Sequence, residues 1–155
     1  MNKTKISLNI SIGVCFAVSA VLFFLIFAGP QIFNLYFVDF RGFDAKGEFI
    51  KTIGKVFALC FYPSAIISAI ILYSLLKLLF NIKNGKVFTE QNVKLLKTVS
   101  YGALVISVIT FVSGIYFMPF LFISAAGIFT GILLRVLKNV MQSAILLKDE
   151  NDLTV

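Results

Sequence analysis

The longest uncharged run in this chain extends from Thr98 to Leu134 and constrains the fold more than any other feature. A single straight helix over this run would be about 55 Å long, whereas the hydrocarbon core of a bilayer is only about 30 Å thick. The run therefore has to fold back on itself. Pro119 lies near its centre, and proline favours the first turn of a new helix. We predict two membrane crossings here, at about 98–117 and 119–138.

Two further apolar runs precede this one. The first, at about 6–28, is uncharged and too long for the hydrophobic region of a typical signal peptide, so we interpret it as an uncleaved anchor. The second, at about 56–76, is also uncharged and holds Pro63, which membrane helices tolerate. Hydrophobic residues make up 59% of the whole chain, and its mean hydropathy is +0.99. We predict a single domain over residues 1–155, an all-α integral membrane four-helix bundle.

The distribution of lysine and arginine predicts how the four crossings are oriented. Basic residues are enriched in cytoplasmic segments, so the richer side is assigned to the cytoplasm. This places an outer loop at 29–55, a cytoplasmic loop at 77–97 and a cytoplasmic tail at 139–155, with both termini cytoplasmic in the plasma membrane. The inner side then holds Lys3, Lys5, Lys77, Lys83, Lys86, Lys94, Lys97, Arg135, Lys138 and Lys148, and the outer side holds Arg41, Lys46, Lys51 and Lys55.

The polar segment 81–97, NIKNGKVFTEQNVKLLK, is the predicted cytoplasmic loop. Asn84-Gly85 indicates a turn, and Thr89 is suited to cap a helix that begins at Glu90. The third helix would therefore extend beyond the membrane into the cytoplasm.

The fourth helix is predicted to extend in the same way. Within 135–148, polar residues including Asn139 recur on one helical face, and Val136, Leu137, Val140, Met141 and Ala144 fall on the other. The two extensions are either a structural stub, whose apolar faces pack on each other, or a docking surface for a protein partner. The candidate docking residues are Lys83, Lys86, Phe88, Thr89, Asn92, Lys94, Arg135, Lys138 and Gln142.

Two other segments carry candidate interaction residues. Phe33, Tyr36, Phe37 and Phe40 recur at helical spacing, which predicts either a short helix in the outer interface or an external binding surface. Gly127 and Gly131 form a GxxxG pattern, which lets helices approach closely within the bundle or, alternatively, in a homodimer.

Several classes of chemistry lack the residues they need. The chain has no histidine, and its two cysteines, Cys15 and Cys60, are isolated in apolar runs. We therefore expect no enzyme activity, no cofactor and no metal site. The net charge of +7 lies beside apolar runs, which favours a bilayer over direct contact with nucleic acid. No crossing has a charge near its middle, which disfavours a small transporter or pore subunit without excluding one.

Two short motifs resemble a known family. Gly85, Phe88, Thr89 and Asn92 form the pattern G-x-x-F-T-x-x-N, and the chain ends in E-N-D-L-T-V at 150–155. With the four predicted crossings, these motifs resemble the bacterial membrane proteins called domain of unknown function 2975. The resemblance implies no activity. It implies a helix-turn-helix regulator as a soluble partner, since members are often encoded beside one.

We therefore predict a non-enzymatic protein that acts by protein–protein interaction. Its partners would be the lipid bilayer and either a small transcriptional regulator, another membrane subunit or a second copy of the chain. An immunity or sensor protein that uses the outer aromatic segment is the second hypothesis, and the transporter or pore subunit is the third.

Overall fold

The computed structural model of this protein describes residues 2–44, 47–115 and 118–152, and these residues form helices joined by short turns. The elements are α1 (Asn2–Asn34), a π-helix η1 (Leu35–Phe40), α2 (Glu48–Lys83), α3 (Glu90–Gly114) and α4 (Pro119–Asp152). Within the described residues, four helices are long and apolar enough to cross a membrane. The prediction of an all-α chain with four such helices is confirmed.

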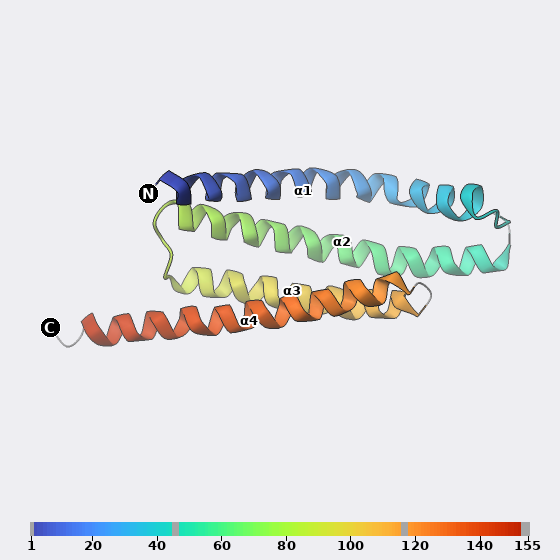
Figure 1. The fold of residues 1–155 in the computed structure, drawn as a ribbon. Coiled ribbons are helices and arrows are strands. Elements are labelled where there is room, and N and C mark those ends of the chain that lie inside the picture. Colours follow the sequence, from blue (N-terminus) through green and yellow to red (C-terminus); the bar gives the residue numbers. More distant parts are fainter. Residues whose placement is uncertain (1, 45–46, 116–117, 153–155) are drawn as a thin grey trace.

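The helices run back and forth, so that the start of α1 and the end of α4 lie at the same end of the molecule (Figure 1). We call this the basic end, because the lysine-rich connection between α2 and α3 also lies there. The opposite end, which holds η1 and the turn between α3 and α4, is called the aromatic end.

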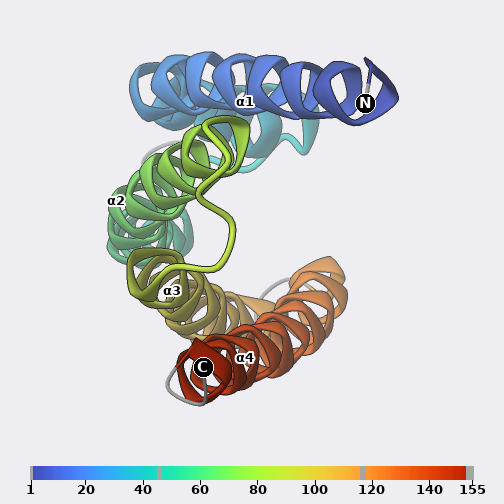
Figure 2. The ribbon, with the colours of Figure 1, turned by 90° about the vertical axis from the view of Figure 1, so that its left-hand side faces the viewer.

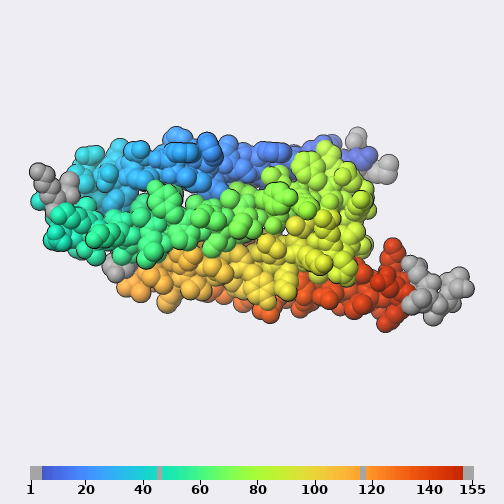
Figure 3. Space-filling view, turned by 180° about the vertical axis from the view of Figure 1, so that it is seen from behind, coloured from blue at the N-terminus to red at the C-terminus, as the bar shows by residue number. Residues whose placement is uncertain are grey.

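Viewed along the helices, the molecule is an open arc in which α1 and α4 occupy the two ends (Figure 2). Each helix packs mainly on its neighbours in sequence, α1 on α2, α2 on α3 and α3 on α4. From the convex side, α2 lies between α1 and α3, and the end of α4 projects beyond the other helices (Figure 3). The predicted four-helix bundle is therefore open on one side. A membrane removes the need for closure, because apolar side chains that face lipid need no protein cover.

The α3–α4 hairpin is held together by small residues. A Cβ atom on Gly131 would lie 2.7 Å from Leu104 Cγ, and one on Gly127 would collide with Ser107 Oγ. Two buried hydroxyl groups bond across the interface: Ser100 donates to Gly131 O and Ser124 to Ser107 O, both at 2.8 Å. The GxxxG pattern thus lies inside the hairpin, against α3.

Aromatic side chains hold α1 and η1 against α2. Phe33 and Phe37 are buried with Ile50 and Ile53, and the ring of Phe33 lies 4.8 Å from that of Phe57. These contacts continue the helical structure beyond the predicted crossings. The segment 29–55, predicted as a loop, is therefore largely helical, because helix length follows packing as well as hydrocarbon thickness.

The turn predicted inside the uncharged run is present. α3 ends at Gly114 and α4 begins at Pro119, as its pyrrolidine ring favours. The predicted end of the third crossing at Phe117 lies outside the described residues.

Candidate functional site

The connection between α2 and α3 at the basic end is held by one buried asparagine. Asn92 is fully buried, and its Nδ2 donates to Lys86 O at 2.6 Å and to Val87 O at 2.8 Å. Its Oδ1 accepts a hydrogen bond from Asn81 Nδ2 at 2.8 Å, which joins the end of α2 to the start of α3. Thr89 is the N-cap of α3, as predicted, and its hydroxyl accepts from the Asn92 amide. Both residues therefore build the loop.

The other predicted docking residues of this loop lie on its surface. Phe88 is 58% exposed, an unusual position for a phenylalanine in a polar loop. Three lysines surround the same connection on the exposed side, namely Lys83, Lys86 and Lys94. The structure thus separates the predicted set into two buried or partly buried loop-forming residues and a group of accessible side chains.

The faces of α4 differ from the prediction made for 135–148. The side of α4 that faces α3 is a seam of residues that lie alternately three and four positions apart in the sequence. These are Ser124, Gly127, Gly131, Leu134, Lys138, Met141 and Ile145. Lys138 therefore lies on the packed face, and Val136, Leu137 and Val140, predicted to pack on α3, are between 51% and 62% exposed. The reason is the hairpin interface: the small residues that permit close approach set the rotation of the whole helix.

The exposed apolar residues of α4 form a second row on the opposite side. We call Leu133, Val136, Val140 and Leu147 the outer strip; their positions follow the same spacing of three and four, with the small Ser143 between the last two. Leu137 borders the outer strip. Gln142 is also exposed on this part of the helix. A helix with apolar rows on two opposite faces can pack on two neighbours at once.

A polar cleft of about 140 Å³ lies between α3 and α4, lined by Lys97, Ser100, Tyr101, Arg135 and Lys138. Lys97 Nζ lies 5.9 Å from the centroid of the Tyr101 ring, and Arg135 Cζ lies 5.7 Å from it. We call this the basic cleft. Both cations lie within reach of one aromatic ring, whose faces attract positive charge.

Arg135 and Lys138 were predicted as docking residues. Lys97 and Tyr101 were not predicted as part of a site. A pattern in the sequence could have found them. Lys97 and Arg135 are the charges that border the run 98–134, and both are equally distant from its midpoint. If the run folds at its centre, these two residues have to meet.

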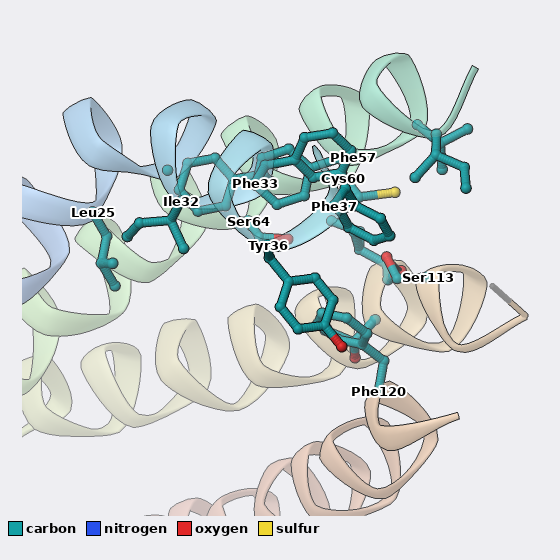
Figure 4. A pocket seen from close by; sticks show the side chains of 16 residues that line it. Leu25, Ile32, Phe33, Tyr36, Phe37, Phe57, Cys60, Ser64, Ser113 and Phe120 are labelled. Carbon is teal, nitrogen blue, oxygen red and sulfur yellow. Dashed lines mark hydrogen bonds between the residues drawn. The ribbon is translucent and has the colours of Figure 1, made fainter. Parts of the chain in front are cut away.

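The aromatic end contains a second candidate site, an apolar cavity of about 530 Å³. Residues of all four helices line it, including Phe33 and Phe37 from the first helical segment, Phe57 and Cys60 from α2, and Phe120 from α4. Tyr36 projects from η1 across the cavity towards Phe120 (Figure 4). Such a cavity suits an apolar molecule or a lipid chain.

The four predicted aromatic residues do not share one face. Phe33 and Phe37 are buried, whereas Tyr36 is 42% and Phe40 is 79% exposed. The prediction assumed a regular α-helix, but residues 35–40 form a π-helix, whose wider turns change the direction of successive side chains.

The comparisons with known proteins agree with the resemblance seen in the two motifs. A family model described as "Protein of unknown function (DUF2975)" matches residues 12–155. No curated protein and no solved structure matches this chain. The matched range includes the α2–α3 connection, the basic cleft, the outer strip and the apolar cavity.

Proposed function

This chain belongs to the DUF2975 family, and from that premise we propose that it is a non-enzymatic plasma-membrane protein that acts by protein–protein interaction. Both termini are cytoplasmic in this proposal, since the basic end holds most of the cations, as the cytoplasmic side of membrane proteins does. The docking surface is the outer strip of α4 together with the exposed side chains of the α2–α3 connection.

The observation that carries this proposal is the position of the outer strip relative to the membrane. Lys97 and Arg135 both lie against the ring of Tyr101 at the end of the uncharged hairpin, so they mark the boundary of the hydrocarbon core. From Val136 to Asp152, α4 continues for about 25 Å beyond that boundary. Val136, Val140 and Leu147 are therefore exposed where water, and not lipid, would meet them. Apolar rows of this kind are covered by a partner helix.

The partner in this proposal is a protein that presents an amphipathic helix. A small helix-turn-helix regulator meets that description and is the partner that the family resemblance implies. The exposed Lys83, Lys86 and Lys94 at the same end of the molecule would favour a partner with an acidic rim.

Photocrosslinking in intact cells tests the docking surface. A photoreactive residue at Ser143, which is exposed within the outer strip, is expected to capture a protein. Combining it with Val140→Asp should abolish most of that capture, because a charge in an apolar contact row costs about 2 kcal/mol or more. The measurement is mass spectrometry of the crosslinked species, with their yields compared between the variants.

Asn139→Asp is the matched control, because it places the same charge on the same helix at an exposed polar position next to Val140. Capture should persist in this variant. Equal yields with Val140→Asp and Asn139→Asp would contradict docking through the outer strip. Capture of a second copy of the chain, in place of another protein, would indicate that the outer strip serves homo-oligomerisation.

A second candidate function, as a sensor or immunity protein, is favoured by the apolar cavity at the aromatic end. In the Cys15→Ser variant, Cys60 in the cavity wall is the single thiol. We expect a bound fatty acid to slow its alkylation by N-ethylmaleimide. The Cys60→Ser variant reports on Cys15, which does not line the cavity, and its rate should stay unchanged. Equal slowing of both thiols would instead indicate a general effect on the detergent or membrane.

A pore or transporter subunit is the third candidate. Ion flux into liposomes that contain this protein alone would favour it over the docking role.

A further inference from the structure

We propose that the basic cleft between α3 and α4 binds a phosphate group, supplied by the headgroup of an anionic phospholipid. The cleft is separate from the outer strip, which lies on the other side of α4, so this inference does not depend on the docking role.

The charges in the cleft lack a compensating anion within the described part of the chain. Lys97, Arg135 and Lys138 line one small space, and the ion pair found among the described residues is a different one, between Lys51 and Glu48. Lys138 is half-buried, because it lies on the packed seam of α4. Three like charges at one site are mutually unfavourable, and an anion bound between them relieves the repulsion.

The position of the cleft along the membrane normal matches that of lipid phosphates. From Lys97 to the end of α3 at Gly114 is about 26 Å of helix, and from Pro119 to Arg135 is about 24 Å. These lengths are close to the thickness of the hydrocarbon core. With the turn at one surface, Lys97 and Arg135 lie at the other, where the headgroups begin. Tyr101, one turn of helix inside Lys97, is placed as interfacial tyrosines are.

The polar groups of the cleft favour phosphate over a neutral ligand. The Ser100 hydroxyl already donates to Gly131 O, so it serves the hairpin. The remaining side-chain donors are cationic, apart from the Tyr101 hydroxyl. A guanidinium group and two ammonium groups together are a good match for the several oxygens of one phosphate. Half-burial of Lys138 strengthens its contact compared with that of a fully exposed lysine.

The experiment compares two variants of the full-length protein that lose the same charge. Lys97→Gln/Arg135→Gln removes two cations from the cleft. Lys94→Gln/Lys148→Gln removes two exposed lysines from the same helices, away from the cleft. Each purified protein is titrated with micelles containing phosphatidylglycerol or phosphatidylcholine, and bound lipid is counted by native mass spectrometry. Thermal unfolding of each variant establishes that it is folded, and Arg135→Lys serves as a milder second variant.

We expect the wild type to retain phosphatidylglycerol in preference to phosphatidylcholine. The cleft variant should bind phosphatidylglycerol about tenfold or more weakly, because each basic residue contributes appreciably to the attraction of anionic lipid, and the control variant should bind as the wild type does. Equal weakening in both variants, or equal retention of the two lipids, would overturn the proposal. Displacement of phosphatidylglycerol by millimolar inorganic phosphate would overturn the lipid source, and would assign the cleft to a soluble phosphate.

Discussion

Replacing Asn92 with leucine is expected to destabilise the protein by about 2–4 kcal/mol, the largest effect of any single polar substitution that we foresee. The side chain is fully buried and makes three hydrogen bonds, two to the carbonyl groups of Lys86 and Val87 and one to Asn81. Leucine fills a similar volume but removes the bonds to both backbone carbonyls and leaves Asn81 with only its longer bond to Gln91. Unfolding of the purified protein in detergent, followed by circular dichroism, should show the midpoint lowered by about 4–16 °C.

Gln91→Ala is the control for this prediction, since Gln91 is the neighbouring residue, is exposed and has one longer hydrogen bond to Asn81 at 3.3 Å. Its midpoint should remain close to that of the wild type. Asn92→Asp separates the hydrogen bonds from the volume, because it keeps the size but replaces the donating amide nitrogen with a carboxylate oxygen, an acceptor that faces two carbonyl oxygens. If Asn92→Asp is as stable as the wild type, the two backbone carbonyls are not held by this side chain.

Gly131→Leu should separate or distort the α3–α4 hairpin, with a loss of about 3 kcal/mol or more. The first added carbon would lie 2.7 Å from Leu104 Cγ and 3.3 Å from Ser100 O. The carbonyl oxygen of Gly131 accepts a hydrogen bond from the Ser100 hydroxyl. A shift that relieves the collision would therefore also break this 2.8 Å hydrogen bond between the two helices. Gly131→Ala should cost less, which gives a graded series. The measurements are the thermal midpoint in detergent and the amount of protein in the membrane.

Gly13→Leu provides a matched comparison, because Gly13 lies in the middle of α1 and nothing stands within 4 Å of the position where its Cβ would be. This variant removes a helical glycine without meeting a neighbour, and it should be neutral or slightly stabilising. Comparable destabilisation by Gly13→Leu and Gly131→Leu would mean that bulk in an apolar helix, and not the contact with α3, causes the effect.

The roles of Thr89, Gly127 and Gly131 were predicted from the sequence, whereas Asn92 was predicted only as a docking residue and is instead buried. Thr89 and Asn92 belong to a cap, which depends on residues three or four positions apart, and a cap is visible in the order of the residues. Gly127 and Gly131 were recognised as a pattern for close approach. The pattern does not identify which helix packs on these glycines, because any apolar helix in a bilayer can approach them closely.

Two expectations failed where packing between distant segments decides the outcome. In the structural-stub alternative Val136 and Val140 pack on the third helix, yet they are exposed, and the half-buried Lys138 lines the basic cleft. Rotation of a helix by half a turn leaves its hydropathy and its periodicity unchanged, so composition alone cannot choose between the two faces. The aromatic segment failed for a related reason: Phe33 and Phe37 are buried and Phe40 is not, because the helix widens into a π-helix at Leu35.

The order of residues in this chain was sufficient to establish four apolar helices, the turn before Pro119, the cap at Thr89 and the family. Each of these depends on local chemistry or on the thickness of a bilayer, which any membrane protein meets in the same way. The open arc, the inward face of α4, the meeting of Lys97 with Arg135 and the cavity behind Tyr36 depend on how helices far apart in the sequence fit together. Those contacts are decided by the shapes of small and aromatic side chains, and the candidate sites for a lipid phosphate, a partner helix and an apolar molecule all arise from them.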